Sequence, residues 1–251
     1  MQLLLTNDDG LESVSLSALS RRLGAEHEVW TFAPERERSA SSHSITLREA
    51  IKVRKLDDRT YACSGTPADC VILAALGVID ARIDMVISGP NIGPNPGTDI
   101  IYSGTAAAAR QAVLMGIPAL ATSLVGSHND ESIDYAVEFV ARNLPLFKEL
   151  ASSNHFLNIN FPDAIKPGEN ISITFPSLRI YRDELDTEIG SNNTIYCKIK
   201  GPPPESRMEH GSDYDAVAAG MISISPIMIH PLNHQIESRY RSASIWSGKK
   251  I

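Results

Sequence analysis

The sequence is more informative at first for what it lacks. Its three cysteines, Cys63, Cys70 and Cys197, are odd in number and have no CxxC spacing, which argues against a disulfide framework and a zinc site. No apolar run approaches the roughly 18 residues of a membrane-spanning helix, and no signal peptide precedes the first apolar segment. Basic runs are short and the formal net charge is -7, which argues against a nucleic-acid duplex as partner. We therefore expect a cytoplasmic protein without a membrane partner.

Several common catalytic motifs are missing too. The chain has no GxGxxG dinucleotide fingerprint and no GxxxxGK[ST] phosphate loop. It also has no GxSxG nucleophile elbow, so a serine hydrolase is a weak hypothesis. The composition is that of an ordinary globular protein, with 43% hydrophobic and 21% charged residues. At 251 residues the chain can bury one sizeable core, or one core and an appendage.

The N-terminus carries the first informative motif. An apolar run over residues 2–5 ends at Asn7-Asp8-Asp9-Gly10, a pattern that predicts a buried strand followed by a turn. In open α/β sheets, ligands bind beyond the carboxyl ends of the strands. Two adjacent carboxylates there need a compensating positive charge, and Mg²⁺ or a related divalent cation supplies it. The alternative is a simple turn before a helix, since these are the usual turn residues.

The order of the following segments indicates an α/β fold. A helical pattern over residues 12–23 is followed by an apolar strand over 28–33, which favours a right-handed crossover and a parallel sheet. Further strands are predicted over 84–88, 117–124 and 156–161, a buried capped helix over 66–79, and a helix over 130–150 with a kink or stop at Pro145. We expect a Rossmann-like, three-layer α/β core with a mostly parallel sheet over 1–165. A β-rich C-terminal extension over 166–251 would then provide an oligomer contact or a substrate lid.

Polar residues follow two more of the predicted strands. Ser39 lies in a hydroxyl-rich loop over 34–44, which could reach a cation or phosphate but also fits a plain solvated loop. Asn91 and Asn95 lie in a loop rich in proline and glycine, and their amides can ligate metal or phosphate without adding charge. Ser103-Gly104-Thr105 opens an alanine-rich helix, whose first turn can bind an anion. A carboxylate-bound cation facing such a helix end is the arrangement that phosphoryl transfer needs.

These motifs, in this order, strongly resemble those of the SurE (stationary-phase survival protein) nucleotidases. The resemblance covers essentially the whole chain. The matching segments are NDDG at 7–10, RS at 38–39, SIT at 44–46, GTPADC at 65–70, SGPNIG at 88–93, YSGT at 102–105, LNINFP at 157–162, SD at 212–213 and GMISISP at 220–226.

The resemblance implies a divalent-metal-dependent phosphatase that hydrolyses nucleoside 5′- and 3′-monophosphates, with one Mg²⁺ or Mn²⁺ per subunit. The positions that match the family's metal ligands are Asp8, Asp9, Ser39 and Asn91. Those that match its phosphate contacts are Asn95, Ser103, Gly104 and Thr105. It also implies a homodimer formed through an exchanged C-terminal segment, sometimes paired into a tetramer.

Two positions depart from the family pattern. Ala40 stands where the family commonly has glycine, and its Cβ would penalise a left-handed backbone that could displace Ser39. Pro90 replaces a more usual aliphatic residue and is expected to restrict Gly89 to extended geometry. We expect both changes to be tolerated.

The sequence leaves more than one mechanism open. In the first, water attacks a phosphomonoester directly, with Asp8 and Asp9 as catalytic residues and one of them as general base. In the second, an aspartate at the end of the first strand forms an aspartyl-phosphate intermediate. A third hypothesis is a non-catalytic phosphate- or nucleotide-binding regulatory module, since receiver domains also place acidic clusters at strand ends.

Overall fold

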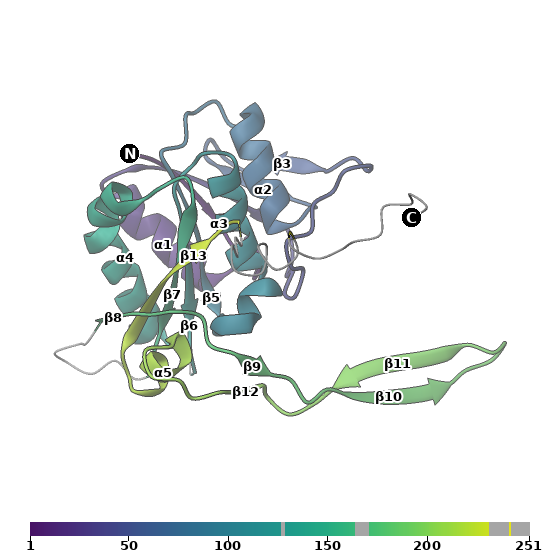
Figure 1. The fold of residues 1–251 in the computed structure, drawn as a ribbon. Helices are drawn as coiled ribbons and strands as arrows, with labels where there is room; N and C mark the ends of the chain where they lie inside the picture. The colour runs from purple at the N-terminus through teal and green to yellow at the C-terminus, as the bar shows by residue number, and fades with distance from the viewer. Residues whose placement is uncertain (127–128, 164–170, 231–240, 242–251) are drawn as a thin grey trace, which may run out of the picture.

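A long, mostly parallel sheet forms the centre of the molecule (Figure 1). The computed structural model describes residues 1–126, 129–163, 171–230 and 241. Within these residues the main sheet has nine strands. In spatial order they are β3 (Val53–Lys55), β4 (Thr60–Cys63), β2 (Glu28–Pro34), β1 (Gln2–Thr6), β5 (Met85–Ile92), β6 (Ala119–Leu124), β7 (His155–Phe161), β13 (Ile222–Met228) and β8 (Ile171–Ile173).

The central strands run in the same direction, so their carboxyl ends meet at one edge. β1 pairs in parallel with β2 and with β5, and Leu5 lies opposite both Thr31 and Ile87. β5, β6 and β7 continue the parallel order, whereas β3–β4 and β7–β13 are antiparallel. The residues that follow β1, β2 and β5 are thereby brought together, which confirms the predicted α/β class.

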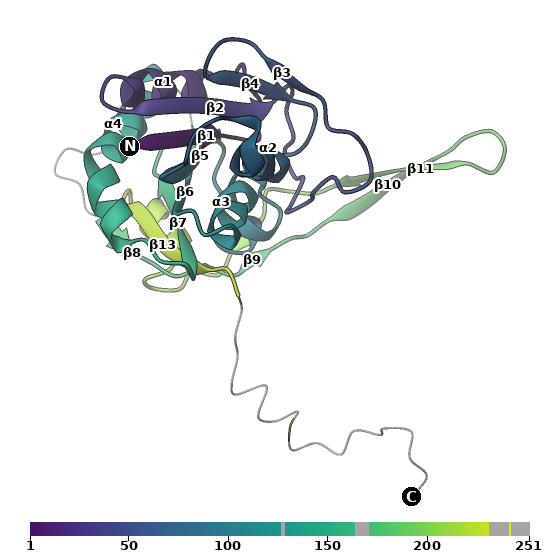
Figure 2. The same ribbon diagram turned by 90° about the horizontal axis from the view of Figure 1, so that it is seen from above.

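Helices cover both faces of this sheet, giving three layers (Figure 2). α1 (Val14–Gly24) and α4 (Asp130–Leu150) pack on one face, and α2 (Pro67–Leu73) and α3 (Gly104–Leu114) on the other. Each face has its own apolar cluster, because strands buried on both sides carry hydrophobic side chains in both directions. Of the kink or stop predicted at Pro145, the stop does not occur, since α4 continues through it to Leu150.

The start of α2 is confirmed and its end is not. Thr66 Oγ1 accepts a hydrogen bond from the Asp69 N–H at 3.1 Å, and the Asp69 carboxylate accepts one from the Thr66 N–H at 2.9 Å. This reciprocal pair is a capping box. The helix then passes into a π-helical turn, η1 (Ala74–Val78), where Leu76 is 73% exposed. The predicted burial of the whole apolar run over 71–79 is therefore wrong.

The C-terminal part of the described chain is β-rich, as predicted. Two of its strands, β8 and β13, belong to the main sheet, so the core includes residues from both sides of residue 165. The others form two small sheets, β9 (Arg179–Ile180) with β12 (Glu205–Ser206) and β10 (Glu184–Ile189) with β11 (Ile195–Lys200). The β10–β11 ribbon projects far from the body (Figure 1), and the short helix α5 (Asp213–Ala218) precedes β13. None of the described helices is long and apolar enough to cross a bilayer.

Candidate active site

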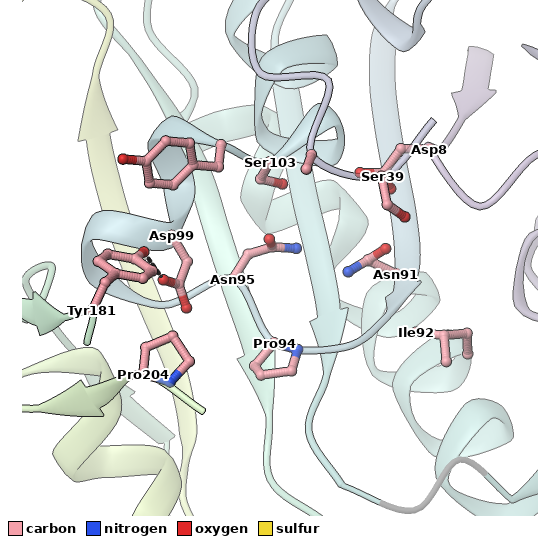
Figure 3. A pocket seen from close by; sticks show the side chains of 12 residues that line it. Asp8, Ser39, Asn91, Ile92, Pro94, Asn95, Asp99, Ser103, Tyr181 and Pro204 are labelled. Carbon is pink, nitrogen blue, oxygen red and sulfur yellow. Dashed lines mark hydrogen bonds between the residues drawn. The ribbon is translucent and has the colours of Figure 1, made fainter. Parts of the chain in front are cut away.

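A cavity of about 350 Å³ opens at the carboxyl edge of the sheet (Figure 3). We call it the strand-end cavity. Side chains following β1, β2 and β5 line one part of it, and residues of the C-terminal β region line another. Its lining residues are Asp8, Ser39, Ala40, Asn91, Ile92, Pro94, Asn95, Asp99, Tyr102, Ser103, Tyr181 and Pro204. The predicted convergence of the three strand ends is therefore confirmed.

Asp8 is buried against the first turn of α3. Its Oδ2 accepts a hydrogen bond from the Thr105 N–H at 3.2 Å, and its Oδ1 accepts one from the Thr105 hydroxyl at 2.5 Å. Burial raises the pKa of Asp8, and the bonds from Thr105 oppose that rise. The carboxylate can approach this closely because residue 104 is glycine. A Cβ built on Gly104 would lie 2.9 Å from the Asp8 Cβ and 2.9 Å from its Oδ2.

The N–H groups of the predicted anion site have partners within the protein. The Thr105 N–H is directed to Asp8, and the Ser103 N–H donates to the Asp99 carbonyl at 3.1 Å. Thr105 is fully buried and does not line the cavity, nor does Gly104. The end of α3 therefore holds Asp8 in place. The phosphate contacts predicted for Gly104 and Thr105 stay a prediction.

Asp9 is partly buried beside Asp8. Its Oδ2 accepts a hydrogen bond from the Ile92 N–H at 3.1 Å, which ties the end of β1 to the end of β5. Burial, together with the negative charges of Asp8 and Glu37, raises the pKa of Asp9 to about 6. In the described part of the chain, no lysine, arginine or histidine forms an ion pair with Asp8 or Asp9. The carboxylates thus lack a protein cation to balance them.

Ser39 and Asn91 bring neutral oxygen atoms to the same end of the cavity (Figure 3). The Ser39 hydroxyl donates to Glu37 Oε1 at 2.8 Å, leaving its lone pairs available. The Asn91 side-chain N–H donates to the Gly93 carbonyl at 2.8 Å. The amide oxygen of Asn91 is therefore left as an acceptor, and in Figure 3 it is turned toward Ser39 and Asp8.

The two departures from the family pattern have different structural outcomes. Ala40 has a φ of 56°, so it adopts the left-handed backbone that its Cβ disfavours by about 1 to 2 kcal/mol. Ser39 still lines the cavity, so the substitution is accommodated. Gly89, in contrast, has a φ of +105° before a cis Gly89–Pro90 bond, and the predicted extended geometry is wrong. β5 continues through these residues to Ile92, with a register shift between Ser88 and Asn91.

Asn95 and Ser103 line the middle of the cavity, as the site prediction requires. The Asn95 N–H donates to Asn160 Oδ1 at 2.9 Å, and its side-chain N–H donates to Ser123 Oγ at 2.8 Å. Asn158 Nδ2 donates to the Asn95 carbonyl at 2.8 Å. These buried bonds fix the position of Asn95 in the cavity lining. Ser103 Oγ caps α3 by accepting the Ala106 N–H at 3.0 Å.

Comparison with known proteins places this geometry in a family. Residues 3–183, more than half of the chain, match the family described as Survival protein SurE. The chain belongs to the SurE family. The 5′-nucleotidase SurE of Geotalea uraniireducens is 37% identical over 238 residues, covering 93% of this chain and 95% of the relative. That of Herpetosiphon aurantiacus is 38% identical over 254 residues, covering 98% and 99%.

A solved structure supports the same assignment. The SurE protein from Aquifex aeolicus superposes with a TM-score of 0.82 at 31% identity, covering 96% of this chain and 98% of that one. The agreement includes the mostly parallel sheet with its helices and the β-rich C-terminal region. The SurE resemblance predicted from the motifs is thus confirmed.

Sequence reasoning missed part of this SurE cavity. Asp99, Tyr181 and Pro204 line it, but no catalytic or binding role was predicted for them. Asp99 lies inside the predicted loop, in the 3₁₀ turn η2 (Gly97–Ile101), and only its proximity to Asn95 signalled it. Tyr181 and Pro204 lie next to the paired strands β9 and β12, which bring them to the cavity. The sequence motifs around Asp8, Ser39 and Asn91 give no indication of this pairing.

Proposed function

We propose that this SurE family member is a divalent-metal-dependent phosphomonoesterase that hydrolyses nucleoside 5′- and 3′-monophosphates to nucleoside and phosphate. One observation carries the proposal: Asp8 lines one end of the cavity together with the neutral oxygens of Ser39 and Asn91. Asp9 does not line the cavity itself, but it is bonded to Ile92 of the lining, and neither carboxylate has an ion-pair partner in the described chain. The relatives named 5′-nucleotidase SurE support a nucleotide as substrate.

The residues at this end of the cavity fit a hard divalent cation. Such ions take oxygen ligands, usually one or two carboxylates together with neutral oxygens, water or substrate phosphate. The carboxylates of Asp8 and Asp9 and the oxygens of Ser39 and Asn91 would hold one Mg²⁺ or Mn²⁺. Burial raises the pKa of both aspartates, and for Asp9 the negative charges of Asp8 and Glu37 add to the rise, as expected for carboxylates without a neighbouring cation. When bound, the cation would neutralise charge on the substrate phosphate and lower the pKa of a water molecule.

Residues of the protein would orient the phosphate and accept a proton. Asn95 and Ser103 would orient the phosphate, because both line the cavity next to the carboxylates. Water attacks phosphorus opposite the ester oxygen, so that a new P–O bond forms as the ester P–O bond breaks. We infer that Asp9 accepts the proton of this water, since both oxygens of Asp8 already accept hydrogen bonds from Thr105. The leaving alkoxide takes a proton from solvent and departs as the nucleoside hydroxyl, and Asp9 returns its proton to solvent.

The test is a phosphate-release screen on the purified, metal-depleted protein, with single divalent cations crossed against 5′- and 3′-nucleoside monophosphates. We expect steady release with Mg²⁺ or Mn²⁺ and none with chelator. Binding of nucleotide without turnover would instead indicate a regulatory module. A phosphoprotein trapped from labelled substrate by acid quench would indicate an aspartyl-phosphate route, which the hydrogen bonds on both Asp8 oxygens disfavour.

We further propose that the β10–β11 ribbon forms the contact of a homodimer, which can pair into a tetramer. Alternate residues of a strand share one face, and directly opposed residues lie side by side. Leu185 therefore shares a face with its partner Ile199, and Ile189 with its partner Ile195. All four are exposed, Ile189 to 83%. A two-stranded ribbon is only marginally stable alone, and an apolar face of this kind is typical of a protein contact.

Charges on that apolar face should dissociate the assembly. We expect Ile189→Asp combined with Ile195→Asp to convert the homodimer to monomers, because burying two carboxylates in an apolar contact is strongly unfavourable. Light scattering after size-exclusion chromatography measures the mass. Lys198→Asp, on the charged opposite face where Lys198 pairs with Asp186, is the control and should stay dimeric. A wild-type protein that is monomeric would contradict the proposal.

A further inference from the structure

The end of the strand-end cavity away from the carboxylates is aromatic (Figure 3). Tyr181 and Pro204 lie at this end, whereas Asp8, Ser39 and Asn91 lie at the other. The Tyr102 and Tyr181 rings meet edge to face, with centroids 5.7 Å apart and an interplanar angle of 85°. Tyr102 comes from the end of η2, and Tyr181 follows β9 in the C-terminal region. Two distant parts of the chain thus supply one aromatic wall.

This wall is held in place by a set of polar contacts. The Tyr181 hydroxyl donates a hydrogen bond to the Asp99 carboxylate. Arg179 Nε donates to the other Asp99 oxygen at 3.0 Å. The Arg179 guanidinium also lies over the Tyr214 ring, 5.1 Å from its centroid, and donates to Ser206 Oγ at 2.5 Å. Because Asp99 is held by Arg179 and Arg179 by Tyr214 and Ser206, these contacts orient the Tyr181 ring in the absence of a ligand.

The wall also carries no net charge toward the cavity. Arg179 balances the charge of Asp99, and only 8% of the Arg179 side chain is exposed. Burial, with the hydrogen bond to Asp99 second, raises the pKa of Tyr181 above its ordinary value, so the phenol stays neutral. A neutral aromatic surface does not repel an anionic substrate. It offers ring faces and edges, which bind planar heteroaromatic rings by stacking and edge contacts.

From this geometry we propose that Tyr102 and Tyr181 form a subsite for the base of a nucleoside monophosphate whose phosphate lies near Asp8 and Ser103. The inference deepens the proposed function and rests on it. It makes Tyr102 and Tyr181 specificity-determining residues, which select phosphomonoesters that carry a planar ring over those with a sugar alone. It also gives the C-terminal region a part in substrate choice, because Tyr181 and Pro204 come from its β9–β12 sheet.

The test compares two substrates that share the same reacting phosphate. Adenosine 5′-monophosphate carries a base, and ribose 5-phosphate does not. For Tyr181→Leu and Tyr102→Leu we expect the kcat/KM ratio of the first substrate over the second to fall about tenfold or more, mainly through KM, since a base–aromatic stack is lost. Tyr196→Leu is the matched control, because Tyr196 is exposed on the ribbon and does not line the cavity. It should leave the ratio unchanged.

A second variant separates the ring from its anchoring bond. Tyr181→Phe keeps the ring and loses the hydroxyl that binds Asp99, so its ratio should lie between those of wild type and Tyr181→Leu. The proposal is overturned if Tyr181→Leu and Tyr102→Leu lower kcat/KM equally for both substrates or leave the ratio unchanged. It is also overturned if the wild type has the same kcat/KM for the two substrates. Hydrolysis of neither substrate by wild type would instead refute the proposed function, so the two failures are distinguishable.

Discussion

Replacing Asp8 with asparagine is expected to lower phosphate release about a hundredfold or more while the protein remains folded. Loss of even an outer partner of a metal ligand typically costs 10- to 100-fold in affinity or activity, and Asp8 is placed as a ligand itself. Asparagine has nearly the same shape, and its amide oxygen can still accept the Thr105 N–H. Its missing charge weakens cation binding at the end of β1. The measurement is kcat/KM for a nucleoside monophosphate for both proteins at a metal concentration that just saturates the wild type.

Stability should respond differently from activity in this variant. Burial raises the pKa of Asp8, which means that the folded protein holds this negative charge at an unfavourable position. A neutral side chain there therefore leaves the thermal midpoint of the metal-free protein unchanged or higher. Asp58→Asn is the matched control, since the Asp58 side chain is fully exposed and its ion pair within the described residues is a local one with Lys55. An Asp8→Asn enzyme that turns over at the wild-type rate would refute the site assignment.

The carboxylate end of the site could be predicted because its signals are local. The apolar run before Asn7 predicts a buried strand, and parallel order then places Asp8, Ser39 and Asn91 at one edge. The capping box at Thr66 and the cap at Ser103 are local as well, since each joins residues three apart in the chain. Patterns of this range can be read directly from a sequence.

The rest depends on contacts between distant residues. The helix end at Ser103 predicts free N–H groups, but Thr105 meets Asp8, 97 residues away in the chain, and its donors are used there. Tyr181 reaches Asp99 across 82 residues through a two-residue strand that has no periodic pattern. The apolar run over 71–79 indicates burial, yet Leu76 is exposed when the described residues alone are considered. Which residues contact a helix end or a strand face depends on the tertiary packing of the whole chain.

Replacing Gly104 with alanine is expected to lower kcat/KM by about a hundredfold, because it displaces Asp8. The added Cβ would lie 2.9 Å from the Asp8 Cβ, its Oδ2 and the Ser41 Oγ, closer than real contacts allow. Misplacement of a reacting group by about 1 Å can reduce the rate by this factor. Alanine is otherwise the better helix former, so the backbone of α3 has no reason to change.

The matched control for this substitution is Gly24→Ala, at the C-terminal end of helix α1. Gly24 is also helical, and a Cβ there meets nothing within 4 Å. Kinetics for both variants, with metal affinity from titration calorimetry, separate a displaced carboxylate from a general effect of adding a methyl group. If Gly104→Ala binds metal and turns over like Gly24→Ala, Asp8 does not need its close approach to α3, and the positioning role of that helix end is wrong. If it alone loses metal affinity, the first turn of α3 is what holds the catalytic carboxylate in register with Ser39 and Asn91.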